Sequence, residues 1–277
     1  MDDATHTLPI TLQRARKASR ISQLDLALRL GISQRHVSFV ETGRSRPSRP
    51  LLLAWLQEID CPLAIRNAAL LQAGYAPAYG SGDPDDPAWR QAHAALAGLL
   101  DAHDPMPALV LDAGWTVVRF NRGGLWLATL LMPFLADRPA GAPLNMLDAL
   151  AHPDGPVRSM TNLAEVGPAL LAHLRQEAAA LPALTPKVET FAALLKARLG
   201  PRPAGLGASP GHPPAPVLTT RFATPVGELA FFSLFTTFGT PQDISLASLR
   251  LEHIFPADPA TAAIVRAAVD GSGRPPR

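Results

Sequence analysis

Two short helical segments separated by a glycine constrain this chain more than any other feature of its sequence. Ser22 precedes the first segment and can cap it, and Gly31 ends that segment where a left-handed residue is needed. Ser33 then begins a second helix almost at once. Helices joined so closely must cross at a steep angle, which requires a small residue at their contact. Ala27 and Val37 fall on the two sides of that junction, so the sequence predicts a helix-turn-helix.

The basic residues of the chain gather on the same segment. Between positions 12 and 49, nine basic residues stand against two acidic ones, a balance of +7, whereas the whole chain of 277 residues carries a formal net charge of +2. A solvated basic face would explain the charge by itself. Combined with the helix pair, the charge favours contact with a polyanion.

The segment from Ser22 to Ser48 resembles the Xre family of bacterial regulators, which is related to the phage Cro and repressor proteins. The likeness covers about residues 8–59 and includes a glutamine at the start of each motif helix, Gln23 and Gln34. It also includes the run Glu41-Thr-Gly-Arg-Ser-Arg-Pro-Ser48. The resemblance implies a transcription regulator that binds double-stranded operator DNA. A helical hairpin without a role in DNA binding is the alternative.

The geometry of such a motif assigns roles to its polar residues. The second helix enters the major groove by its N-terminal end, where glutamine can pair with adenine and arginine with guanine. Base contacts are therefore expected from Gln34, Arg35 and Ser38. Gln23 is expected to meet a phosphate, because helix N-termini bind anions. The other predicted DNA contacts, of which the arginines face the backbone and the histidine faces either DNA or solvent, are His36, Arg44, Arg46 and Arg49.

A segment rich in proline, glycine and aspartate follows between positions 76 and 87 and is typical of a domain boundary. We expect a helix-turn-helix domain over residues 1–80, a linker and connecting helix over 81–104, and a second domain over 105–277. No charge-free apolar run reaches the roughly 20 residues that a membrane span needs, and the N-terminus lacks a signal-peptide pattern. The sequence therefore predicts a cytoplasmic protein that contacts no membrane.

The second domain mixes helix and strand patterns. Its predicted strands cover residues 108–111, 115–120, 217–222, 228–238 and 245–255, and its predicted helices cover 88–102, 125–135, 161–181 and 188–199. The last strand alternates apolar and polar residues, which is typical of a sheet with one buried face. The fold class is therefore an all-α N-terminal domain followed by an α+β domain with about five antiparallel strands.

Patterns that would support catalysis are weak in the second domain. Residues 207–211 match G-x-S-x-G, but they lie in a proline-rich loop rather than between a strand and a helix. The acidic and histidine residues at 101–104 and 152–154 are explained better by helix ends and turns than by metal binding. The single cysteine, Cys61, excludes a cysteine-based zinc cluster within the chain. We expect no enzyme, no catalytic residue, no metal site and no cofactor.

The order of elements in the second domain is similar to that of the MmyB-type ligand-binding domain, which commonly follows an Xre-type helix-turn-helix. The similarity rests on the predicted hairpin, on the helix that begins Asn121-Arg-Gly-Gly-Leu-Trp126, and on the run Phe222-Ala-Thr-Pro-Val-Gly-Glu-Leu229. It covers most of residues 104–259. The resemblance implies a PAS-like sheet and a pocket that holds a medium- or long-chain fatty acid or a similar lipid.

A bound fatty acid would need a dry wall for its chain and a donor for its carboxylate. The predicted wall residues are Leu109, Leu111, Trp115, Val117, Leu125, Trp126, Leu130, Phe231, Phe235, Leu249 and Leu251. The candidates for the head-group contact are Arg119, Asn121, Arg221 and His253. The same apolar surplus also fits an alternative, in which the domain is a ligand-free module for dimerisation or protein interaction. In the ligand-binding interpretation, the protein is a homodimer in which the ligand changes the arrangement of two helix-turn-helix units.

Overall fold

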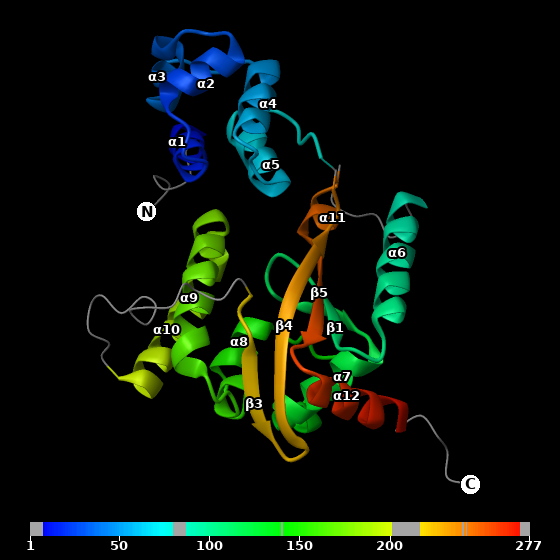
Figure 1. The fold of residues 1–277 in the computed structure, drawn as a ribbon. Helices are drawn as coiled ribbons and strands as arrows, with labels where there is room; N and C mark the ends of the chain where they lie inside the picture. The colour runs from blue at the N-terminus through cyan, green and yellow to red at the C-terminus, as the bar shows by residue number, and fades with distance from the viewer. Residues whose placement is uncertain are drawn as a thin grey trace. The chain divides into compact units, whose positions relative to one another are not determined.

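The computed structural model describes residues 8–79, 87–139, 141–200, 217–239, 241 and 243–271. The chain divides into two compact units (Figure 1). The first unit comprises residues 1–89 and 239–247, and the second comprises residues 90–238 and 248–277. The division at residue 89 falls inside the segment predicted to connect the domains. Nearly all of the loop predicted over 200–216 lies outside the described residues.

The first unit is helical in its described part. Its helices are α1 (Leu8–Ala18), α2 (Gln23–Leu30), α3 (Gln34–Glu41), α4 (Arg49–Glu58) and α5 (Leu63–Gln72). Ser22, Ser33 and Ser48 each precede a helix, and each hydroxyl accepts a hydrogen bond from the backbone N–H three residues later. Serine caps therefore fix the starts of α2, α3 and α4.

The predicted helix-turn-helix is confirmed in α2 and α3. Gly31 adopts a φ of +64°, and its N–H bonds back to α2, as a left-handed helix end requires. Ala27 is 2% exposed and Val37 is 0% exposed. Both belong to a core that also contains the fully buried Trp55 of α4. The steric reason for the crossing, a small residue at the contact, therefore holds.

The second unit is built on an antiparallel sheet of five strands, as predicted. The strands are β1 (Ala108–Leu111), β2 (Val117–Phe120), β3 (Thr220–Thr224), β4 (Gly227–Thr237) and β5 (Arg250–Pro256), in the order β2-β1-β5-β4-β3. Several predicted strand boundaries are wrong, the largest differences being at the starts of β3 and β5. β3 begins three residues later than expected, and a short helix, α11 (Ile244–Ser248), occupies the first part of the segment predicted as the last strand.

Helices cover both faces of this sheet (Figure 1). The helices are α6 (Pro87–His103), α7 (Arg122–Leu131), α8 (Met146–Ala151), α9 (Leu163–Ala180), α10 (Thr185–Leu199) and α12 (Pro259–Gly271), with short 3-10 turns at Pro133–Asp137, Pro156–Arg158 and Pro182–Leu184. The sequence analysis missed α8 and α12. No helix in the described part of the chain is long and apolar enough to cross a membrane.

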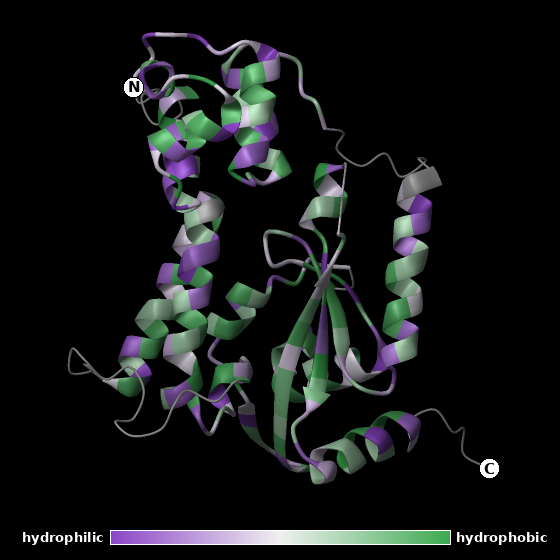
Figure 2. Cartoon of the chain, turned by 45° about the horizontal axis from the view of Figure 1, so that its top comes forward, coloured by the Kyte–Doolittle hydropathy of each residue, from purple (hydrophilic) through white to green (hydrophobic). Residues whose placement is uncertain are grey.

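The pairing of the strands decides which residues share a face. Leu109 of β1 and Phe235 of β4 both pair with Glu252 of β5, so these three side chains project to the same side of the sheet. Leu251 and His253 project to the opposite side, where the His103 ring of α6 lies 4.8 Å from the ring of His253. The predicted single buried face is therefore wrong. Figure 2 shows the strands coloured mostly as apolar, in keeping with cover on both sides.

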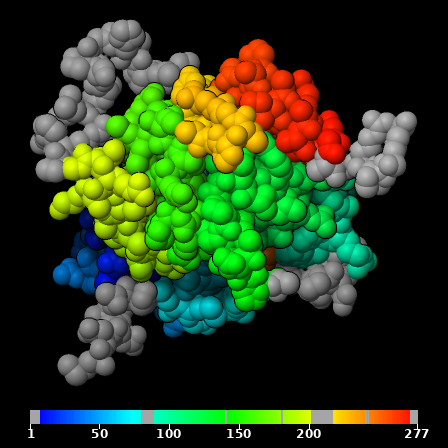
Figure 3. Space-filling model, turned by 90° about the horizontal axis from the view of Figure 1, so that it is seen from below, coloured from blue at the N-terminus to red at the C-terminus, as the bar shows by residue number. Residues whose placement is uncertain are grey.

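The helix α12 covers the end of the sheet at which β3 turns into β4. This helix packs against α7 and β4, and Val265 and Val269 enter the same core cluster as Leu229. Figure 3 shows this end of the second unit, where the turn between β3 and β4 lies next to α12. The Thr261 hydroxyl of α12 also accepts a hydrogen bond from the N–H of Ala230 in β4, at 3.0 Å. The end of the sheet is therefore held by both apolar and polar contacts.

Candidate nucleic-acid interface and ligand pocket

The N-terminal end of α3 presents polar side chains to solvent. Gln34 and Arg35 are exposed directly after the cap Ser33. His36 and Ser38 are half-buried, and the His36 N–H donates to the Ser33 hydroxyl at 3.2 Å. This end of α3 therefore has the exposure that a helix entering the major groove requires.

Phe39 is the centre of a small aromatic and cationic arrangement on α3. The guanidinium of Arg35 lies 5.1 Å from the centre of the Phe39 ring, and that of Arg44 lies 5.9 Å from it. Cation–π attraction at these distances orients both arginines with respect to the helix. The sequence analysis gave neither arginine a partner within the protein, because a single phenylalanine between them carries no distinctive pattern.

Two of the residues predicted to contact DNA, Arg46 and Gln23, make contacts within the first unit. Arg46 donates to the carbonyl of Ala73, and its guanidinium lies 5.6 Å from the centre of the Tyr75 ring. Gln23 donates from Nε2 to the Glu41 carboxylate at 2.8 Å. Of the other predicted backbone contacts, Arg44 and Arg49 are exposed.

A buried ion pair ties the first helix to the end of the third. Nε of Arg16 lies 2.7 Å from one Glu41 carboxylate oxygen, and its Nη2 lies 2.9 Å from the other. A third hydrogen bond joins Arg16 to the carbonyl of Ile21 at 2.7 Å. Hydrogen bonding to Glu41 raises the pKa of Arg16, against the effect of burial. The pairing was not predicted from the sequence, because partners 25 positions apart give no local signal.

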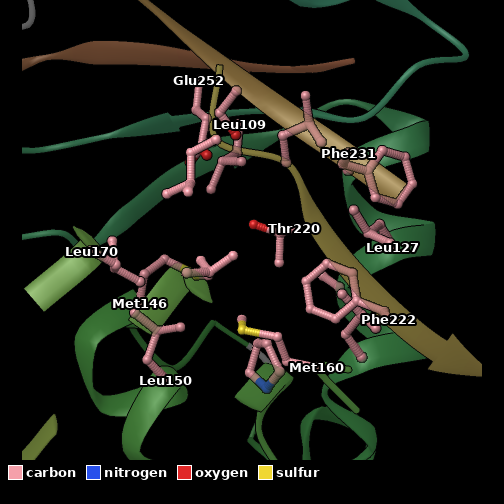
Figure 4. A pocket seen from close by; sticks show the side chains of 18 of the residues that line it. Leu109, Leu127, Met146, Leu150, Met160, Leu170, Thr220, Phe222, Phe231 and Glu252 are labelled. Carbon is pink, nitrogen blue, oxygen red and sulfur yellow. The ribbon is translucent and has the colours of Figure 1, made fainter. Parts of the chain in front are cut away.

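The second unit contains a pocket of about 530 Å³ on the face of the sheet that carries Glu252 (Figure 4). Its walls come from all five strands, from the turn that carries Trp115, from helices α7, α8 and α9, and from the segments around Met160 and Val217. Most of the side chains are apolar. The labelled residues in Figure 4 are Leu109, Leu127, Met146, Leu150, Met160, Leu170, Thr220, Phe222, Phe231 and Glu252.

Part of the predicted wall lies at this pocket. The predicted residues that line it are Leu109, Trp115, Phe231 and Phe235. The predicted residues that do not line it are Leu111, Val117, Leu125, Trp126, Leu130, Leu249 and Leu251. Leu111 and Val117 instead pack in the neighbouring core cluster, and Leu125 is 54% exposed.

Some wall residues were predicted wrongly because the prediction chose the wrong side of one helix, α7, and of one strand, β5. The side of α7 that lines the pocket carries Gly124, Leu127 and Leu131, whereas the prediction took residues on other sides of that helix. A side chain at Gly124 would clash with the carbonyl of Ala108 at 2.3 Å, so glycine is what lets α7 approach the sheet. In β5 the pocket residues are Glu252 and Ile254, which alternate with the predicted Leu251.

None of the four predicted head-group residues lines the pocket. Asn121 caps α7 and is buried, with its amide bonded to the N–H groups of Ala108 and Gly124 and to the carbonyl of Met106. Arg221 is exposed and pairs with Glu228 at 3.3 Å. Arg119 lines a separate small cavity against α6, and His253 contacts α6 on the opposite face of the sheet.

Several polar groups beside the pocket contact the carboxylate of Glu177 in α9. Its carboxylate accepts hydrogen bonds from Arg250 at 2.6 Å and from the Trp115 indole at 2.6 Å, and the His173 ring lies 3.1 Å away. The Arg250 guanidinium also lies over the Trp115 ring, 4.2 Å from its centre. Burial disfavours the ionised form of Glu177 and acts to raise its pKa. Its partners, of which Arg250 has the largest effect, together outweigh burial, and the pKa of Glu177 is lowered.

Glu252 is the acidic residue among the described residues that line the pocket. Burial raises the pKa of its carboxyl, and a hydrogen bond with Ser233 and the charge of Arg250 oppose that shift. The residue keeps some accessible surface, and because it lines the pocket, that surface faces the pocket interior. Sequence analysis placed Glu252 on a polar, outward face and missed it for that reason.

Comparisons with known protein families agree with both halves of this description. A model described as the MmyB-like transcription regulator ligand binding domain matches residues 81–268, and a model described as Helix-turn-helix matches residues 12–65. A search among curated proteins finds no match. Both resemblances stated from the sequence are confirmed. Within the described residues, no group of three histidine, cysteine, aspartate or glutamate side chains could hold a metal ion.

Proposed function

Because the chain belongs to the family of MmyB-like transcription regulators, we propose that it binds operator DNA as a homodimer through α3 and holds a small apolar regulatory ligand in the pocket of its second unit. The ligand acts by shifting the protein between states that differ in affinity for DNA. The single observation that carries the proposal is the apolar pocket of about 530 Å³ in the family-matched unit.

The exposed end of α3 supports the DNA-binding part of this proposal. Gln34 and Arg35 have free access to a groove, and the Phe39 ring orients Arg35. Arg44 and Arg49 are the exposed cations best placed to meet phosphates, since both follow α3 closely and are exposed. Arg46 and Gln23 support the unit internally, so we assign them a smaller share of the contact with DNA.

The dimensions and walls of the pocket support the ligand-binding part. Its volume lies within the range of roughly 300–1,000 Å³ that is common for small-molecule sites. Apolar walls favour a hydrocarbon chain, since each buried methylene contributes about 0.8 kcal/mol. This supports the chain of the medium- or long-chain fatty acid that the family resemblance implies. The head group of the ligand is a separate question, because the polar residues of this pocket differ from those predicted.

A pocket-filling variant tests this function with a close control. Ala169 and Ala172 are both exposed residues of α9, and of the two only Ala169 lines the pocket. We expect Ala169→Trp to lower the binding of a neutral apolar dye, N-phenyl-1-naphthylamine, at least tenfold, and Ala172→Trp to leave it unchanged. Equal dye binding by the folded Ala169→Trp variant would contradict the pocket as the ligand site. It would instead favour the ligand-free interaction module.

Mass spectrometry of an organic extract provides a second line of evidence. The purified wild-type protein is expected to carry an apolar small molecule that Ala169→Trp lacks and that Ala172→Trp retains. Comparison of the two variants separates a ligand in the pocket from lipid attached to the surface.

A further inference from the structure

We propose that the pocket selects an apolar amine, whose hydrocarbon part lies against the apolar walls and whose ammonium group pairs with the carboxylate of Glu252. The inference rests on the proposed function, since it names the chemistry of the ligand in the same pocket. It differs from the expectation of a fatty acid in the charge of the head group.

Glu252 is part of the wall of the pocket. This residue lies in β5, between Leu109 of β1 and Phe235 of β4 in the strand pairing. All three line the pocket, and Figure 4 shows Glu252 beside Leu109, at the far side of the pocket from Met160. A carboxyl group is thus set into a mostly apolar wall, whose other polar side chains are His173, Thr220 and Ser233.

The surroundings of Glu252 call for a partner that donates hydrogen bonds. An ionised carboxylate loses its hydration when it is buried, and a buried charge is stable only when it is paired. Ser233 supplies one hydrogen bond, and burial still raises the pKa of Glu252 above its ordinary value. A cationic ligand would supply the missing partner.

The basic side chains close to the pocket already contact a carboxylate of the protein, that of Glu177. Arg250 makes two hydrogen bonds to Glu177, at 2.6 Å and 3.2 Å. The His173 ring lies 3.1 Å from the same carboxylate. The described residues that line the pocket include no lysine or arginine. His173, the histidine among those lining residues, already contacts Glu177. A fatty-acid carboxylate would therefore find no free lysine or arginine at the wall to pair with.

Three probes of equal chain length separate these possibilities in the full chain. Decylamine, decanol and decanoic acid would each be titrated against bound N-phenyl-1-naphthylamine at neutral pH, and their displacement constants compared. We expect the amine to displace the dye at a concentration at least tenfold lower than the alcohol, with the acid weakest. An acid that binds as tightly as the amine, or an alcohol that equals both, would overturn the proposal.

Glu252→Gln tests the assigned partner, because glutamine keeps the shape of the side chain and removes its charge. The variant is expected to fold, since burial disfavours the charge that it removes. It should lose the tenfold preference for the amine and bind decanol as the wild type does. Glu228→Gln, on an exposed residue of β4 outside the pocket, is the matched control and should keep the preference. Retention of the preference in Glu252→Gln would overturn the assignment.

The pattern of outcomes also separates this inference from the proposed function. If all three probes displace the dye equally, the pocket binds apolar ligands and only the amine selectivity is wrong. If none of them displaces the dye and Ala169→Trp leaves dye binding unchanged, the ligand pocket itself is wrong, and the inference is overturned with it.

The dependence of amine binding on pH gives a readout that does not need a substitution. Amine affinity should rise several-fold as Glu252 ionises with increasing pH, at a pH above the ordinary range of a glutamate because burial raises its pKa. Arg250, on the same strand, is the charged group that acts on Glu252, and it pairs in turn with Glu177 of α9, which the His173 ring also contacts. The difference between wild type and Glu252→Gln isolates the contribution of Glu252 from that of every other titratable group. Parallel pH profiles for the two proteins would contradict the proposal.

Discussion

In the first unit, the residues proposed to meet DNA fall between positions 23 and 49, on α2, on α3, on the segment after α3 and at the start of α4. In the second unit, the pocket is lined by residues from Leu109 to Ile254, drawn from strands and helices that are far apart in the sequence. The first site depends on local geometry, and the second depends on how a sheet and its helices pack. Substitutions should therefore act through different mechanisms in the two units.

The largest effect is expected from Glu41→Ala in the first unit. This change leaves Arg16 charged and buried without its partner, which costs about 3–5 kcal/mol. Peptides from α1 and α3 should lose protection in hydrogen exchange, and DNA binding should fall with them. Peptides from β1 to β5 should exchange as in the wild type, because the ion pair lies wholly in the first unit.

Glu58→Ala provides the control for this experiment. Glu58 is an exposed glutamate at the end of α4, so its loss should change exchange by little. If Glu41→Ala altered the second unit as strongly as the first, the two units would not be separate in stability, and the comparison drawn above would fail.

A somewhat smaller effect is expected from Asn121→Ala in the second unit. Loss of this cap leaves the start of α7 and the N–H of Ala108 without an acceptor, at a cost of about 2 kcal/mol. Urea unfolding followed by hydrogen exchange should show the loss in the second unit only. Asn121→Asp keeps the acceptor and removes the donor, so it should retain part of the stability. Equal losses in both variants would show that the acceptor contributes nothing.

Local sequence signals predicted the first unit well for a physical reason. Serine caps, a left-handed glycine and a small residue at a helix crossing each act within a few positions, as Ser22, Gly31 and Ala27 show. The Arg16–Glu41 pair escaped because its partners meet only in the folded unit.

The five antiparallel strands of the second unit were predicted from the sequence, but their order in the sheet and the orientation of its faces were not. Alternation in β5 identified the apolar side correctly, yet Leu251 faces away from the pocket and Glu252 faces into it. Periodicity shows that two faces differ and does not tell which face borders a cavity. The helix α8, with six residues, is too short for a periodic signal, so its pocket residues Met146 and Leu150 were missed.

A third prediction sharpens the comparison within the DNA-binding unit. Arg35→Ala should lower affinity for the preferred operator by about 1–3 kcal/mol and relax the choice of bases, because arginine can read guanine directly. Arg44→Ala should weaken binding to all sequences alike and reduce the slope of affinity against salt by about 1. Gel shifts at several salt concentrations with matched and altered operators would measure both. Identical behaviour of the two variants would contradict the assigned roles.

The smallest predicted effect concerns the dependence of stability on pH in the second unit. The folded-state pKa of Glu177 lies below its ordinary value of 4.5, so its contribution is present above that value and is lost as pH falls through the folded pKa. Urea unfolding of wild type and Glu177→Gln should therefore differ most near neutral pH and converge in acid. A difference that stays constant across this range would show that Glu177 acts through packing alone.

The coupling between pocket and DNA binding tests the account most directly. Fluorescence anisotropy would measure the affinity of the full chain for an operator selected from random DNA, with and without saturating decylamine. We predict a change of about fivefold or more in the wild type, in line with typical coupling energies, and no change in Ala169→Trp. An unchanged affinity in the wild type, or an equal change in both proteins, would contradict the account.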